Sequence, residues 1–207
     1  MIYSLQVYTS QAIGSENIMA TTVRWTSADL EALPEDDGKR YEIIDGELCV
    51  SKQPHWHHQF VCAQILGRLQ EWSNRTGAGR ANLAPGIVFS EDNDVAPDLV
   101  WISTERLAAS LGRGGHLHAA PELIVEVLSP GAVNEWRDRE VKLKLYSRRA
   151  VQQYWIVDWQ LRKIEIYRRE NLALQLVTTL REGDVVETSL LPGFSCSVTA
   201  VFENLPT

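Results

Sequence analysis

The 207-residue chain lacks any apolar run of the roughly 20 residues that a membrane-spanning helix needs, so we expect no membrane span. Its first 18 residues contain no lysine or arginine and no long apolar core, which argues against a secretory signal. It has only three cysteines, Cys49, Cys62 and Cys196, and their spacing does not match a metal site. An odd number of such cysteines predicts small buried side chains in a reducing compartment, and we expect a cytoplasmic protein.

Basic residues are also fewer than acidic residues. The 20 lysines and arginines face 27 aspartates and glutamates, which gives a net charge of −7. This balance argues against a protein that simply coats nucleic acid, because such binding depends on neutralising phosphates. The shortage is uneven, since residues 137–149 hold six basic and two acidic side chains. A local basic face beside an acidic site is therefore compatible with the sequence.

The length and the 44% hydrophobic content are those of one domain with a full core. We expect residues 1–18 to be a dispensable N-terminal extension and residues 19–207 to form the single domain, because the regular pattern begins just after Met19. The sequence has no internal repeat and no low-complexity tract.

Apolar patterns along the chain predict an α/β fold. Asp45-Gly46 lies between two short strand-like segments and is the strongest hairpin signal. Residues 57–72 have apolar positions at spacings of three and four, which indicates an amphipathic helix. The other expected elements are a helix at 27–33, strands at 86–89, 98–102 and 123–128, a helix around 135–149, and strands at 154–157, 163–167, 173–177 and 185–188. Their order gives an αβββαβ core with a mixed sheet, an N-terminal hairpin and C-terminal antiparallel strands.

Glu126 is the only charge in the apolar run at residues 123–129, which is typical of a strand buried on both faces. An ionised carboxylate is costly there unless a cation or donor lies beside it. Asp98 stands at the start of the adjacent expected strand, so a divalent metal shared by the two carboxylates is the simplest partner. The alternatives are a structural ion pair for Glu126 and a turn-forming acid for Asp98.

The following segment supplies a lysine. Residues 137–146 contain strong helix formers and no glycine or proline, and Asp138, Lys142 and Tyr146 fall close to one helical face. Two acids and a lysine are the minimum set for metal-assisted phosphodiester hydrolysis: the carboxylates hold Mg²⁺, and the ammonium supports the nucleophile or the developing charge. The structural alternatives for Lys142 are a surface pair with Asp138 and a buried pair with Glu126.

Taken together, these residues resemble the PD-(D/E)xK nuclease superfamily and, within it, the Uma-two group of restriction-endonuclease-like proteins. The resemblance covers about residues 20–203. It rests on residues 41–48 (Tyr-Glu-Ile-Ile-Asp-Gly-Glu-Leu), His58 at a helix start, Pro97-Asp98, residues 126–130, the Asp138/Lys142/Tyr146 spacing and residues 153–158. The expected αβββαβ core is similar to the restriction-endonuclease-like fold of that superfamily.

One position departs from the superfamily pattern. The superfamily lysine stands two residues after the acid, where this chain has Leu128. The Uma-like pattern resembles one in which the following helix supplies the lysine, and Lys142 fits that place. Lys144 fits less well, because it points about 200° around a helix from Lys142.

The resemblance implies an endonuclease that depends on Mg²⁺ or Mn²⁺, acts on DNA and works as a homodimer. It implies Asp98, Glu126 and the Val127 carbonyl as metal ligands, Lys142 as the residue that supports the attacking water, and Glu42 as a further carboxylate. An exposed charge on an edge strand is the alternative for Glu42. The rival function is a catalytically inactive nuclease fold that binds DNA or another protein, and the acidic net charge favours it.

We expect structural roles for the histidines and the aromatic residues. A zinc site at His55, His57 and His58 is not favoured, because no second ligand cluster with tetrahedral spacing follows. His58 is expected to line the cleft or to cap the helix. Tyr146 and Trp155 are expected in the core rather than as base-stacking platforms.

Overall fold

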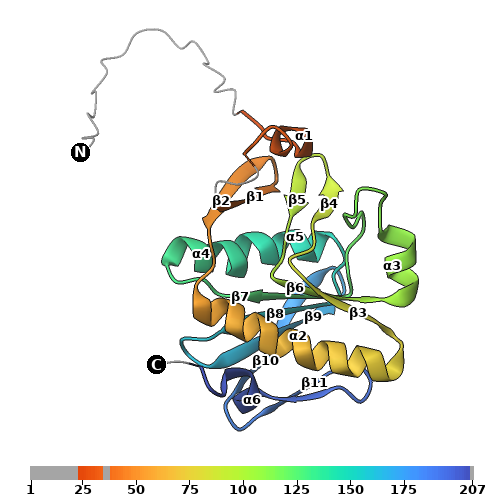
Figure 1. Ribbon diagram of the computed structural model, residues 1–207, viewed down its shortest axis with the longest axis vertical. Helices are drawn as coiled ribbons and strands as arrows, with labels where there is room; N and C mark the ends of the chain where they lie inside the picture. The colour runs from red at the N-terminus through yellow and green to blue at the C-terminus, as the bar shows by residue number, and fades with distance from the viewer. Residues whose placement is uncertain (1–22, 35–37, 206–207) are drawn as a thin grey trace, which may run out of the picture.

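Figure 1 shows the computed structural model, which describes residues 23–34 and 38–205. The expectations of a dispensable extension at residues 1–18 and of a domain that starts at residue 19 lie outside the described residues. The helices are α1 (Ser27–Leu30), α2 (Trp56–Thr76), α3 (Thr104–Ser110), α4 (Ala132–Trp136), α5 (Leu143–Arg148) and α6 (Val198–Phe202). Among the described residues, no helix combines the length and the apolar character needed to cross a membrane.

A mixed sheet forms the centre of the described part of the chain, with strand order β10-β9-β8-β7-β6-β3. Its strands are β3 (Gly79–Leu83), β6 (Leu99–Ser103), β7 (Leu123–Val127), β8 (Gln153–Asp158), β9 (Lys163–Glu170) and β10 (Ala173–Arg181). β7 and β8 run parallel, and the other neighbours are antiparallel. The predicted mixed α/β fold is confirmed, and the C-terminal strands β9 and β10 extend this central sheet.

Helices cover both faces of the central sheet (Figure 1). The core on the α2 side contains Leu69 and Val125, whereas the core on the α5 side contains Ile124 and Leu145. Successive side chains of a strand point to opposite faces, so Glu126, two residues after Ile124, projects toward α5. The alternation along β7 therefore decides which helix can supply a partner for Glu126.

A second sheet has the strand order β2-β1-β5-β4 and lies at the opposite end of the molecule from α6 (Figure 1). Its strands are β1 (Lys39–Ile44), β2 (Glu47–Lys52), β4 (Ile87–Ser90) and β5 (Asn93–Val95). The predicted hairpin is confirmed: Asp45 and Gly46 have φ angles of 52° and 77° between β1 and β2. Positive φ at both positions is what a tight two-residue hairpin turn requires.

The prediction that residues 86–89 form the first core strand is wrong. That segment is β4 of the second sheet, and the first of the three core strands is β3. The sequence does not predict β3, because this strand lies at the sheet edge and buries only Gly79 and Ala81, so large apolar side chains do not alternate along it. With β3 in that place, the order α2, β3, β6, β7, α4–α5, β8 gives the expected αβββαβ core.

The helix predicted around residues 135–149 is interrupted. A π-helical segment, η1 (Arg137–Lys142), joins α4 to α5. Such π-turns inside helices occur often at functional sites. At the C-terminus, the strand predicted at 185–188 is β11 (Val185–Glu187), which pairs with β12 (Ser195–Ser197) in a small sheet of their own.

Candidate functional site

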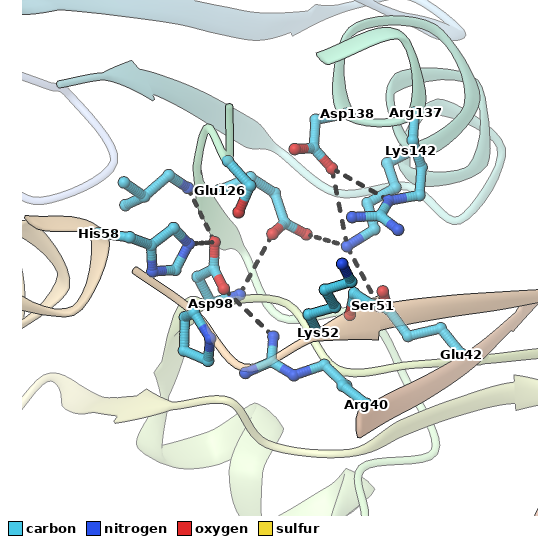
Figure 2. A pocket seen from close by; sticks show the side chains of 13 residues that line it. Arg40, Glu42, Ser51, Lys52, His58, Asp98, Glu126, Arg137, Asp138 and Lys142 are labelled. Carbon is cyan, nitrogen blue, oxygen red and sulfur yellow. Dashed lines mark hydrogen bonds and ion pairs between the residues drawn. The ribbon is translucent and has the colours of Figure 1, made fainter. Parts of the chain in front are cut away.

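Charged side chains from both sheets, α2 and η1 meet in a small cavity near the ends of β6 and β7 (Figure 2). It is lined by Arg40, Glu42, Ser51, Lys52, Pro54, His58, Asp98, Glu126, Val127, Ser129, Arg137, Asp138 and Lys142. Its volume is about 30 Å³, close to the share of one water molecule in the liquid. The structure therefore brings together every site residue expected from the sequence.

Asp98 lies immediately before β6 and is held by three donors. Its Oδ2 accepts hydrogen bonds from His58 Nε2 at 3.0 Å and the Val127 amide at 2.9 Å, and its Oδ1 accepts one from Arg40 Nη1 at 3.2 Å. Burial alone would raise the pKa of Asp98, but the hydrogen bond and charge of His58, together with Lys142, hold it well below its usual range. These partners are far away in sequence, so the turn-forming alternative for Asp98 is wrong.

Glu126 is buried beside Asp98. Its Oε1 accepts hydrogen bonds from Lys142 Nζ at 3.0 Å and from the Tyr146 hydroxyl at 2.8 Å. Its Oε2 accepts a longer one, 3.3 Å, from the Asp98 amide. Burial raises the pKa of Glu126 to about 8, although Lys142 acts in the opposite direction. Glu126 thus lies next to Asp98, and their convergence on one metal ion stays a prediction.

Lys142 is only 2% exposed and lies among three carboxylates. Its Nζ is 3.0 Å from Glu126 Oε1, 3.1 Å from Glu42 Oε1 and 3.9 Å from Asp138 Oδ1. Burial would lower the pKa of Lys142, but these carboxylates outweigh it and hold the pKa above its usual range. The alternative of a surface pair with Asp138 is wrong, because both side chains are buried.

Glu42 is 1% exposed, so the alternative of an exposed edge-strand charge is also wrong. Its Oε1 accepts a hydrogen bond from the Ala96 amide at 3.0 Å and lies beside the Lys142 ammonium. The structure therefore places Glu42 against the lysine, on the side away from Asp98 (Figure 2).

Asp138 and Arg137 reach the same cavity from η1. Asp138 Oδ1 and Arg137 Nε lie 3.8 Å apart, and neither buried atom has a hydrogen-bond partner among the described residues. Burial raises the pKa of Asp138 to about 6, against the pull of Lys142 and Arg137. Four carboxylates thus face several cations across the cavity, and the site is close to electrically balanced.

A second donor group overlaps this site: one ligand atom each of His58, Cys62 and Asp98 lie within 4.8 Å of one another. Cysteine binds metals as the thiolate, but burial holds the pKa of Cys62 well above its usual range. His58 lines the cavity as expected, whereas the helix cap is His55, which accepts a hydrogen bond from the His57 amide. The pair Asp98 and Glu126 is accordingly the better metal-binding candidate.

The donor set fits a hard divalent cation. Asp98 and Glu126 offer carboxylate oxygens, which Mg²⁺ and Mn²⁺ prefer, and Mg²⁺ commonly binds through one or two carboxylates and several waters. Among the residues that the structure describes, Glu126 Oε2 accepts only the 3.3 Å hydrogen bond, so it retains lone-pair capacity on the side of Asp98. The site can therefore hold such an ion without losing the contacts of Glu126 Oε1.

Residues 27–199 match the family Uma2, described as "Putative restriction endonuclease". The chain belongs to the Uma2 family. A crystal structure of "a putative nuclease belonging to DUF820" from Anabaena variabilis ATCC 29413 has a similar fold, with a TM-score of 0.70 and 18% identity over 87% of this chain and 99% of that chain. No curated protein matches the chain. The Uma2 membership confirms the resemblance seen in the sequence and makes this a nuclease-like protein.

Arg40 and Tyr146 contact the two acids of this Uma2 site directly, and the sequence does not predict these contacts. Arg40 binds Asp98, and its signal was the alternation along β1, which puts Arg40 and Glu42 on one face. Tyr146 is buried, as expected, but its hydroxyl donates to Glu126. The i, i+4 spacing from Lys142 could have indicated this shared target. Trp155 is a core residue, as expected.

Proposed function

We propose that this Uma2 protein is a Mg²⁺-dependent or Mn²⁺-dependent endonuclease that hydrolyses DNA phosphodiester bonds. The observation that carries the proposal is the meeting of Asp98, Glu126 and Lys142 in one cavity. Carboxylates from neighbouring strands with a buried ammonium beside them are the set that metal-assisted phosphodiester hydrolysis needs.

Asp98 and Glu126 would hold the ion, with the Val127 carbonyl as a further ligand by resemblance to the superfamily. Once bound, such an ion polarises a phosphoryl oxygen and lowers the pKa of its water. Arg40 and His58 fix the Asp98 carboxylate from two sides, and Tyr146 fixes that of Glu126.

Lys142 has the position of the charge-stabilising group. Its ammonium lies against Glu126 and can orient the attacking water or offset negative charge that develops on the phosphorane. Glu42, anchored by the Ala96 amide, holds the ammonium in place. In this proposal Glu42 acts through Lys142.

The proposal is tested by Mn²⁺ titration in a calorimeter and by plasmid nicking with the same preparation. We expect one Mn²⁺ per chain, nicking of supercoiled DNA with Mg²⁺ or Mn²⁺, and no nicking in EDTA. A protein that binds Mn²⁺ but cleaves no DNA, across several substrates and salt concentrations, would favour the rival function.

Affinity for the metal should depend on pH. Because burial raises the pKa of Glu126 to about 8, this ligand must release a proton to bind a cation below that pH. Mn²⁺ affinity should therefore rise between about pH 6 and pH 8 and then level off, with proton release that shrinks over the same range. Calorimetry in buffers of different ionisation enthalpy measures both quantities, and a pH-independent affinity would contradict this assignment.

The rival proposal is a nuclease fold kept as a DNA-binding or protein-interaction module. Lys142 neutralises Glu126 and Glu42, as a purely structural ion cluster would, and the net charge is −7. The two proposals separate on cleavage, since only the enzyme nicks DNA in a metal-dependent way.

We also propose that the protein acts as a homodimer, because restriction enzymes of the resembled superfamily commonly cut both strands as dimers. The three cysteines without metal-site spacing support a cytoplasmic location. Sedimentation of the protein with and without DNA checks the dimer: a monomer in both conditions would overturn it.

A further inference from the structure

A larger cavity lies directly beside the carboxylate site. The two cavities share four lining residues, Ser51, Lys52, Ser129 and Arg137, so they are adjacent. The larger one has a volume of about 400 Å³, whereas the carboxylate cavity has about 30 Å³. The larger cavity can therefore accommodate a group the size of a nucleotide and not only an ion.

The larger cavity has the opposite electrostatic character. Lys52 and Arg137 line it together with the neutral polar side chains of Ser51, Asn134 and Ser129, and no carboxylate is among its lining residues in the described parts of the chain. The Lys52 side chain is exposed and, within residues 23–34 and 38–205, forms no ion pair, unlike Lys142 with its three carboxylates. Such a lining selects an anion.

A cluster of stacked rings adjoins this cavity through His55. His55 lines it, and the rings of His55, His57 and Trp159 are nearly parallel, with centroids 4.7–5.5 Å apart. The indole is fixed by a hydrogen bond from Trp159 Nε1 to the Leu128 carbonyl at 3.0 Å, next to the lining residue Ser129. Rigid rings next to a cationic cavity are the combination that binds single-stranded nucleic acid, because bases stack on rings and phosphates pair with cations.

We infer that the larger cavity binds a backbone phosphate next to the reacting one, with an unpaired base of the same strand against the His55, His57 and Trp159 rings. This inference rests on the proposed function and specifies its substrate as DNA that is single-stranded at the cleavage site. Lys52 is the phosphate-binding cation of this subsite, and the ring cluster is its stacking surface.

Fluorescence anisotropy tests the phosphate contact, with a labelled single-stranded DNA of about 12 nucleotides, in EDTA, at increasing NaCl concentrations. Lys52→Ala should make the plot of log affinity against log salt concentration less steep by about 0.7, which is the contribution of one phosphate on a single strand. It should also weaken binding about five-fold at 0.1 M salt. Lys144→Ala is the matched control, because Lys144 is exposed on α5 and lines a different cavity. Lys52→Arg should restore the slope.

The stacking contact has its own signature. His57→Ala should weaken binding of the single strand about five-fold or more. A hairpin duplex of the same sequence should bind less tightly than the single strand to the wild type and should respond less to His57→Ala.

Equal salt slopes for the wild type, Lys52→Ala and Lys144→Ala would overturn the phosphate contact. Tighter binding of the duplex, or no effect of His57→Ala, would overturn the unpaired base. Mn²⁺ titration of the same variants keeps this result apart from the proposed function. Lys52→Ala should bind Mn²⁺ like the wild type. If the wild type binds Mn²⁺ and nicks DNA but the salt slopes of the three proteins are equal, this inference fails and the proposed function stands.

Discussion

Asp98→Asn should abolish Mn²⁺ binding and lower metal-dependent DNA cleavage by at least about 10²-fold. The substitution keeps the size of the side chain and one acceptor oxygen for His58 or Val127, but it removes the negative charge that the cation requires. Because the pKa of Asp98 lies well below its usual range, the carboxylate is fully ionised at neutral pH, and the whole charge is lost. Calorimetry with Mn²⁺ and plasmid nicking measure the two effects.

A matched control is Asp45→Asn. Asp45 is exposed and pairs with Arg148 on the surface, so its loss should change stability by less than about 1 kcal/mol and leave Mn²⁺ binding intact. If the Asp98→Asn protein binds Mn²⁺ as tightly as the wild type, other residues hold the ion and Asp98 is not a ligand. Glu126→Gln would then be the next variant to examine.

The two acids of this site can be predicted from the sequence, because the residues next to Glu126 in the chain already show that its charge would be costly to bury. A charge inside an apolar strand needs a partner, so Glu126 stands out by itself, and the next strand start supplies Asp98. The register confirms the pairing: Leu99 lies opposite Val125, and one step further brings Asp98 to Glu126.

Other parts could not be found in this way, because tertiary contacts decide them. β3 has little apolar alternation, since an edge strand covers little of the core. The π-helical turn at η1 follows no propensity rule that residues 137–142 display, yet it brings Arg137, Asp138 and Lys142 to one cavity. Arg40 has no distinguishing feature in the sequence, and the expected place of His58 in the cleft does not identify Asp98 as its partner, because these contacts form only when the second sheet and α2 fold over Asp98.

Lys142→Met should destabilise the fold by roughly 3–5 kcal/mol in EDTA at about pH 9, above the pKa of about 8 of Glu126, because it leaves the Glu126 and Glu42 carboxylates buried without their cation. For a domain of this size the loss corresponds to a fall of about 6–20 °C in melting temperature. The double variant Lys142→Met/Glu126→Gln should recover part of this loss, since one buried charge is then removed together with its partner. Thermal and urea unfolding measure both variants.

Lys144→Met is the control for this substitution, because Lys144 is exposed two residues away on the same helical stretch and should melt with the wild type. Cleavage is then measured well below the melting temperature of Lys142→Met, so that every variant is folded. If the ammonium supports the attacking water, activity falls by about 10²-fold or more in Lys142→Met while Mn²⁺ binding persists. If the folded variant cleaves as fast as the wild type, Lys142 serves only as the counter-ion of Glu126 and Glu42, and the catalytic assignment fails. If Lys142→Met melts at the same temperature as the wild type, Lys142 does not neutralise Glu126 and Glu42, because a methionine cannot neutralise two buried carboxylates.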